Sequence, residues 1–215
     1  DVCAAWGGGT LLVHKDSVNA GGAGDPLCKV PDNVTDEQAV LAYLFCVSLK
    51  GVQRLGLTED FTGTVLVFGA GMNGIGAAQI IRIKAPKATI VLAEPHPYRQ
   101  SIARHYADFV ITPDEAGIKQ LEEITNGKKA DKIIECSGNP TVPGILYRYL
   151  KDGGWKDDDE PGYIHLNGDY PEKLLFDHYH RWFVKNANMS MTCAMKWSAK
   201  AHQSAEPRKG YQESA

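Results

Sequence analysis

A glycine-rich turn between an apolar run and a helix-like segment constrains the fold of this chain more than any other feature. The run 65–68 leads directly into Gly69-Ala70-Gly71-Met72-Asn73-Gly74, and a helical pattern follows. In such a G-x-G-x-x-G turn the first glycine permits the tight turn, the second lets the backbone approach a pyrophosphate, and the third lets helix and strand pack closely. The helix N-terminus offers free N–H groups to the anion. The turn therefore predicts a strand–turn–helix unit that binds a dinucleotide.

An acidic residue follows the turn at the distance that such a site requires. The apolar run 89–93 ends on Glu94, twenty positions after Gly74. A carboxylate at this place can accept hydrogen bonds from both ribose hydroxyls of NAD, and its charge disfavours the 2′-phosphate of NADP. Arg99 weakens that preference slightly, because its side chain can turn toward such a phosphate. We therefore expect NAD as the cofactor.

From Thr64 onward, strand-like and helix-like runs alternate regularly. Strands are expected at 64–68, 89–93, 108–112, 131–136, 162–167 and 188–194, and helices at 75–84, 97–107, 114–125, 140–150 and about 172–185. The strand runs are almost continuously apolar, which is typical of a parallel sheet covered on both faces. The alternation predicts an α/β fold, a doubly wound parallel sheet of the Rossmann type.

The remaining segments flank this domain. Residues 1–30 are rich in glycine and poorly periodic, and they are interpreted as an arm or as the remnant of another domain. Thr35 and Gln38 have the spacing of a capping box, so a helix is expected to begin there and to end before Gly56. Residues 31–197 then form the dinucleotide-binding domain with this leading helix. Residues 198–215 form a polar tail.

Composition narrows the functional class. The 215 residues carry a formal net charge of −3, and Lys and Arg are scattered, which argues against a nucleic-acid partner. No apolar stretch approaches the roughly 20 residues of a membrane span. The five cysteines include no C-x-x-C pair, and the N-terminus has no secretion signal. These features favour the cytoplasm.

A turn of small polar residues follows the expected strand at 131–136. In open α/β sheets, ligands bind beyond the carboxyl ends of the strands, so Cys136 and Ser137 are candidates to lie beside the nicotinamide ribose. The alternative is that small residues merely suit a tight strand-to-helix turn. Cys136 has no partner base in the sequence, and no catalytic residue is assigned.

Several segments together resemble one enzyme family. They are Val65-Leu66-Val67-Phe68-Gly69-Ala70-Gly71, Glu94, Ile134-Glu135-Cys136-Ser137-Gly138-Asn139, Leu150-Lys151-Asp152-Gly153-Gly154 and Leu166-Asn167-Gly168. Over residues 31–195 the chain is similar to the cofactor-binding half of the medium-chain, zinc-type alcohol dehydrogenases. The resemblance implies hydride transfer between a nicotinamide and a small alcohol or carbonyl substrate, and a homodimer formed through an edge strand.

The resemblance also implies roles for individual residues. Gly71, Met72 and Asn73 would present their backbone to the pyrophosphate, and Glu94 would hold the adenosine ribose. In addition, Arg99 would flank the adenine and Gly168 would border the nicotinamide.

The departures from the family concern the metal and the catalytic domain. The family builds a separate catalytic domain from both ends of a longer chain, and only residues 1–30 are candidates for it here. No Cys/His/Glu set with the character of zinc ligands is present, so no metal site is expected. His178 and His180 lie two positions apart, and on a helix they would face different sides.

Two further patterns lead to alternatives. Tyr147 and Lys151 have the spacing of the catalytic pair of short-chain dehydrogenases, but they follow the glycine turn too closely, and we interpret the match as coincidence. A methyltransferase that uses S-adenosylmethionine also has a glycine turn and a later acid, although its cofactor lacks the pyrophosphate that the third glycine suits. A non-catalytic nucleotide-binding or scaffold subunit is the other alternative to an NAD-dependent dehydrogenase.

Overall fold

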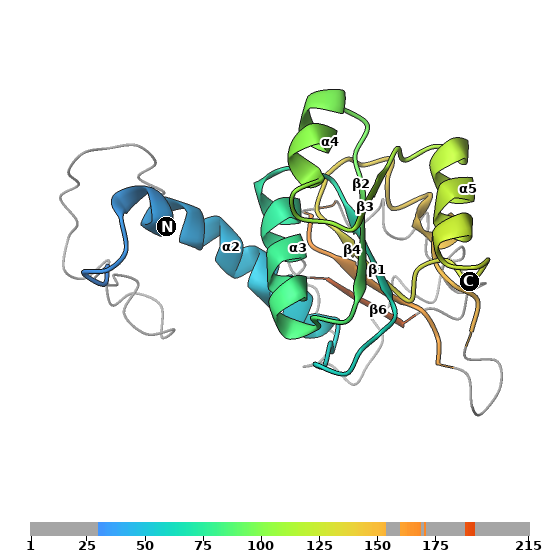
Figure 1. Cartoon of the computed structure of the whole chain (residues 1–215), viewed down its shortest axis with the longest axis horizontal. Helices are drawn as coiled ribbons and strands as arrows, with labels where there is room; N and C mark the ends of the chain where they lie inside the picture. Colours follow the sequence, from blue (N-terminus) through green and yellow to red (C-terminus); the bar gives the residue numbers. More distant parts are fainter. Residues whose placement is uncertain (1–29, 154–159, 169, 171–187, 192–215) are drawn as a thin grey trace, which may run out of the picture. The chain divides into compact units, whose positions relative to one another are not determined.

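The computed structural model describes residues 30–153, 160–168, 170 and 188–191 (Figure 1). The chain divides into two compact units, 1–41 and 42–215. Helix α2 (Asp36–Arg54) begins in the first unit and ends in the second. The expected arm before Val30, the helix at 172–185 and the tail at 198–215 lie outside the described residues.

The capping box at the start of α2 is confirmed. The Thr35 N–H donates to Oε1 of Gln38 at 3.0 Å, and the Gln38 N–H donates to Oγ1 of Thr35 at 3.3 Å. Two donors at the helix start are thereby satisfied reciprocally. After the helix, Gly56 adopts a φ of +60°, a conformation that favours glycine and separates α2 from the first strand.

Within the described residues, the second unit contains one parallel sheet. Its six strands are β1 (Thr64–Phe68), β2 (Thr89–Ala93), β3 (Phe109–Ile111), β4 (Lys132–Glu135), β5 (Tyr163–Leu166) and β6 (Asn188–Met191). Their order in the sheet is β3-β2-β1-β4-β5-β6, and each neighbouring pair is parallel. The expected doubly wound sheet is thus confirmed. The strand order reverses between β1 and β4, which is where open α/β sheets bind their ligands.

Helices cover both faces of the sheet. They are α3 (Met72–Lys84), α4 (Pro97–Ala103) and α5 (Glu115–Ile124). Figure 1 shows α3 and α4 on one face and α5 on the other. Successive strand residues point to opposite faces, so Val67 packs in the same core cluster as Ile81 of α3, and Leu66 in the same cluster as Leu121 of α5. Both faces are consequently apolar, which explains the continuous apolar runs in the sequence.

The expected helix at 140–150 is wrong. This segment is a series of turns that contains only a short 3₁₀ helix, η1 (Leu146–Arg148). Pro140 and Pro143 cannot donate backbone hydrogen bonds, and the Asn139 side chain accepts from the N–H and the hydroxyl of Thr141 at 3.0 and 2.9 Å. This local turn competes with the helix.

Other boundaries differ only slightly. Strands β3, β4 and β5 are each one residue shorter at both ends than expected, α4 ends at Ala103 instead of 107, and α3 begins at Met72.

Candidate functional site

Two glycines of the turn are required by close backbone packing. Gly69 follows β1 with a φ of +91°, and a Cβ there would lie 2.9 Å from the Cα of Ser137. A Cβ on Gly74 would lie 1.8 Å from the carbonyl oxygen of Gly69. No side chain larger than hydrogen fits at either position. The turn therefore brings the start of α3 tightly against the end of β1 and beside the turn after β4.

The start of α3 is left open. Its N-cap is Gly71, with φ −76° and ψ −174°, and no side chain accepts a hydrogen bond from the first turn. The first turn carries no acidic residue, and a Cβ on Gly71 would meet nothing within 4 Å. The first N–H groups of a helix have no partner within the helix, and its N-terminus carries a partial positive charge. The N-terminus of α3 can consequently accept an anion.

Glu94 lies directly beside this turn. Its side chain is only 3% exposed; Oε2 accepts from the N–H of Ala70 at 2.8 Å, and Oε1 from the N–H of His96 at 2.9 Å. Each carboxylate oxygen has a second lone pair. The carboxylate is thereby held in one orientation and keeps acceptor capacity on both oxygens.

These groups border one cavity of about 220 Å³. The lining residues are Phe68, Gly69, Gly71, Ala93, Glu94, Pro95, Arg99, Pro113, Cys136, Ser137, Asn139 and Val142. Six of the predicted site residues are thus brought together, from the turns after β1, β2 and β4 and from α4. The exposed side chain of Arg99 lies on the same cavity as Glu94.

Four predicted site residues do not line the cavity. Met72 is 43% exposed at the start of α3, and the carbonyl oxygen of Asn73 accepts from Oγ of Ser48 on α2 at 2.8 Å. Gly74 is buried against Gly69, as described above. Gly168 follows β5 and borders the side chain of Glu135 instead.

The thiol of Cys136 is poorly suited to act as a nucleophile. Burial and the neighbouring carboxyl group of Glu135 raise its pKa. Its sulfur lies 3.8 Å from Nδ2 of Asn167, which can donate a weak hydrogen bond to it. A thiol becomes a nucleophile when its pKa is lowered, so the environment of Cys136 favours a packing role.

Sequence reasoning assigned no role to two polar residues beside the cavity. Glu135 ends β4 and is fully buried, and Tyr170 follows β5 with an exposure of 7%. The signal for Glu135 was a carboxylate that follows two isoleucines at the end of β4. Tyr170 lies outside any sequence pattern, because only the fold brings it next to β4.

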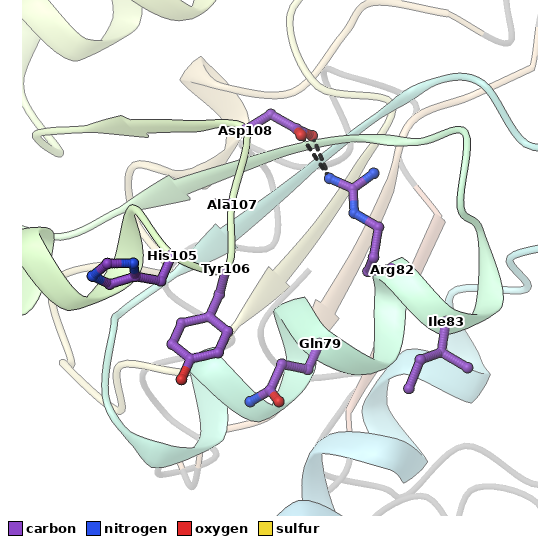
Figure 2. A pocket seen from close by; sticks show the side chains of 7 residues that line it. All are labelled: Gln79, Arg82, Ile83, His105, Tyr106, Ala107 and Asp108. Atoms are coloured by element: carbon purple, nitrogen blue, oxygen red, sulfur yellow. Dashed lines mark hydrogen bonds and ion pairs between the residues drawn. The ribbon is translucent and has the colours of Figure 1, made fainter.

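A larger hollow of about 490 Å³ lies elsewhere (Figure 2). Its lining residues are Gln79, Arg82, Ile83, His105, Tyr106, Ala107 and Asp108. Nη2 of Arg82 donates to both carboxylate oxygens of Asp108 at 2.7 Å, and Nη1 donates to the carbonyls of Pro86 and Ala88 at 3.1 Å. The guanidinium group therefore connects α3 to the amino ends of β2 and β3 through these hydrogen bonds. Ligands of such sheets bind at the opposite end, where the smaller cavity lies.

Neither of the other sequence patterns forms a site in the described part of the chain. Tyr147 lies on η1, and Nζ of Lys151 pairs with Oδ1 of Asp131 at 2.9 Å. Within the described ranges, no three His, Cys, Asp or Glu side chains lie close enough to hold a metal ion. His178 and His180 lie outside those ranges, so the expectation of no metal stays a prediction. None of the described helices has the length and apolar character needed to cross a membrane.

Strand order and helix placement define a Rossmann-type α/β domain, and solved structures share this fold. A zinc-dependent alcohol dehydrogenase from Streptococcus pneumonia matches with a TM-score of 0.61 at 16% identity, over 77% of this chain and 45% of that chain. A protein described as a short chain alcohol dehydrogenase from Escherichia coli, solved with NADH, matches with a TM-score of 0.61 at 20% identity, over 77% of this chain and 46% of that chain.

Curated relatives point to the same enzymes, although no family model matches the chain. L-galactonate-5-dehydrogenase of Escherichia coli is 28% identical over 66% of this chain and 42% of its own length. An uncharacterized zinc-type alcohol dehydrogenase-like protein of Haemophilus influenzae is 30% identical over 56% and 35%. Sorbitol dehydrogenase of Ovis aries is 34% identical over 53% and 32%.

Over the matched residues the chain is thus similar to zinc-type alcohol dehydrogenases and related dehydrogenases, the resemblance that its motifs suggested. It spans less than half the length of these relatives.

Proposed function

We propose that this chain is the cofactor-binding part of an NAD(H)-dependent oxidoreductase of the alcohol dehydrogenase type. The observation that carries the proposal is the contact between the Ala70 N–H and Glu94 at the uncapped start of α3. This contact joins an anion-binding helix end to a fixed carboxylate on one cavity, which suits the pyrophosphate and the ribose of a dinucleotide.

Each protein group has a separate task in this proposal. The backbone at Gly71, Met72 and Asn73 binds the pyrophosphate, and Glu94 accepts from the ribose hydroxyls through the free lone pairs of its two oxygens. Arg99 covers the adenine, while Ser137 and Gly168 border the nicotinamide side. When bound, the nicotinamide supplies the hydride chemistry.

The charge of Glu94 supports NAD as the preferred cofactor. A 2′-phosphate would lie against a carboxylate that, in the described part of the chain, forms no ion pair. A methyltransferase fits the open helix end less well, because its cofactor brings no phosphate to that end. The substrate is an alcohol or its carbonyl product, by analogy with the sorbitol, threonine and galactonate dehydrogenases among the relatives.

Fluorescence titration with NADH, NADPH and S-adenosylmethionine tests the proposal. We expect NADH to bind more tightly than the other two. Glu94→Ala should weaken NADH binding roughly 10- to 100-fold, since hydrogen bonds to a charged group contribute about 1.5–3 kcal/mol. Glu94→Ala should also reduce the preference for NADH over NADPH.

Controls separate loss of binding from loss of fold. Glu94→Gln keeps one acceptor oxygen for the backbone donors, and Glu123→Ala removes an exposed carboxylate on α5, remote from the cavity lining. Equal NADH affinity of Glu94→Ala and Glu123→Ala would refute the ribose assignment. Activity assays with NAD and sorbitol, L-threonine or L-galactonate complete the test. If the chain binds NADH but oxidises none of these substrates, the nucleotide-site assignment is retained and a non-catalytic subunit is favoured.

A further inference from the structure

The carboxyl group of Glu135 is unevenly satisfied. Its Oε1 accepts from the backbone N–H of Ser137 at 2.6 Å and also from the Ser137 hydroxyl. Its Oε2 is buried and has no hydrogen-bond partner among the described residues. A buried polar atom without a partner destabilises the folded state. Oε1 therefore stabilises the turn after β4, whereas Oε2 can still accept a hydrogen bond.

A second unpartnered oxygen lies on the neighbouring segment. The hydroxyl of Tyr170 is buried and also has no hydrogen-bond partner within the described ranges. A Cβ on Gly168 would lie 2.8 Å from Oε2 of Glu135 and 2.9 and 3.0 Å from Cε2 and Cζ of Tyr170. The carboxyl group and the hydroxyl-bearing end of the ring thus converge on one glycine, which leaves room for them to meet.

The surroundings of this pair are apolar. Tyr170 belongs to the core cluster that includes Phe68 of β1 and Leu166 of β5, the register neighbours of Glu135. The ionisable groups that act on the carboxyl group and its partner are the phenol of Tyr170 and the thiol of Cys136. Burial raises the pKa of Glu135, and burial together with the carboxylate raises the pKa of Tyr170. Negative charge is consequently disfavoured here.

We propose that Glu135 and Tyr170 form a positioning pair, in which a carboxyl–phenol hydrogen bond ties the segment after β5 to the turn after β4. Ser137 lines the nucleotide cavity and is held by the same carboxyl group. The pair thereby sets the positions of Ser137 and Gly168 on the nicotinamide side of the site. This inference rests on the proposed function for its effect on the nucleotide, but not for the pair itself.

The direction of the pH dependence follows from burial. A carboxyl group whose pKa is higher in the folded than in the unfolded chain binds more protons when folded. Its contribution to stability is therefore complete at low pH, below the unfolded value of about 4.3, and decreases as the pH rises toward the folded value. The Tyr170 hydroxyl opposes this loss, because a hydrogen bond donated to the carboxylate favours its ionised form and lowers the pKa of Glu135.

Two variants test the pair without NADH, by urea unfolding between pH 5 and 8. Glu135→Gln cannot ionise, but its Oε1 can still accept from Ser137 and its Nε2 can donate to Tyr170. It should lose less stability than the wild type as the pH rises. Tyr170→Phe keeps the ring and removes the hydroxyl, so it should lose more. Tyr147→Phe, on η1, is the matched control and should follow the wild type.

NADH affinity over the same pH range tests the effect on the site. Glu135→Gln should bind within about twofold of the wild type at pH 5.5 and keep this affinity at pH 8. Tyr170→Phe should bind at least fivefold more weakly at pH 8, a loss that Tyr147→Phe does not share.

Either of two results would overturn the pair. One is a Tyr170→Phe variant with the stability profile and the NADH affinity of Tyr147→Phe. The other is a stable Glu135→Gln variant whose pH profile of unfolding equals that of the wild type. Failure of the wild type to bind NADH at any pH would refute the proposed function instead, while the unfolding profiles would still decide on the pair.

Discussion

The starts of α3 and α5 share a closely packed glycine but differ in their N-caps. In both helices the third residue is a glycine, and a Cβ on Gly74 or Gly117 would lie 1.8 Å from a carbonyl oxygen five residues earlier. At α5 the N-cap is Asp114, whose Oδ1 accepts from the Gly117 N–H at 2.8 Å. At α3 the N-cap is Gly71, and no side chain caps the helix.

The shared glycine and the different N-caps serve different purposes. The shared glycine brings each helix close to the strand that precedes it, which is a requirement of packing. The carboxylate of Asp114 satisfies the donors and the positive end of α5 from within the chain. Among the described residues, no side chain caps the equivalent donors of α3, and the N-cap Gly71 lines the cavity that Glu94 also borders.

The largest expected effect tests what the two helices share. Gly74→Ala and Gly117→Ala should each lower the free energy of unfolding by about 3 kcal/mol or more, because the added methyl group meets backbone that cannot move aside. Urea unfolding measures both. Gly71→Ala is the control, since the position is open and its φ is ordinary, and it should cost less than about 1 kcal/mol. A mild effect at Gly117 alone would show that the two helix starts are not equivalent.

A smaller effect on the fold, but a large one on binding, should follow from giving α3 the cap of α5. Gly71→Asp places a carboxylate at the helix start, where it satisfies the free donors and repels phosphate. NADH affinity should fall on the order of 100-fold in a titration, a change of about 2.7 kcal/mol, while the stability stays the same or rises. Gly71→Asn caps without charge, and comparison of the two variants divides the loss between blocked donors and repulsion. Unchanged affinity in both would refute anion binding at α3.

The smallest effect should come from removing the cap of α5. Asp114→Ala leaves the Gly117 N–H without its acceptor and should destabilise the fold by about 1 kcal/mol. NADH affinity should not change, because Asp114 does not line the cavity. Asp114→Asn can still accept from the same N–H and should restore most of the stability. Thermal unfolding and the NADH titration together check this, and weakened binding would contradict the separation of the two helix ends.

Much of the fold was predictable because it depends on local patterns. Strands β1 and β2 and the helix α5 follow from apolar runs and caps that lie within a few residues of each other. The helix at 140–150 was predicted wrongly because Asn139 and the two prolines favour turns, and turn chemistry prevailed over helical spacing.

The candidate site divides in the same way. The amino-acid sequence by itself determined the glycine turn, the acid after the second strand and the order of strands and helices, because these depend on residue type and spacing along the chain. Only the tertiary structure decided that Glu94 holds Ala70, that Arg82 is committed to Asp108, and that Glu135 and Tyr170 converge on Gly168. Such contacts join residues from different strands and loops, and their distances depend on how the sheet brings those segments together.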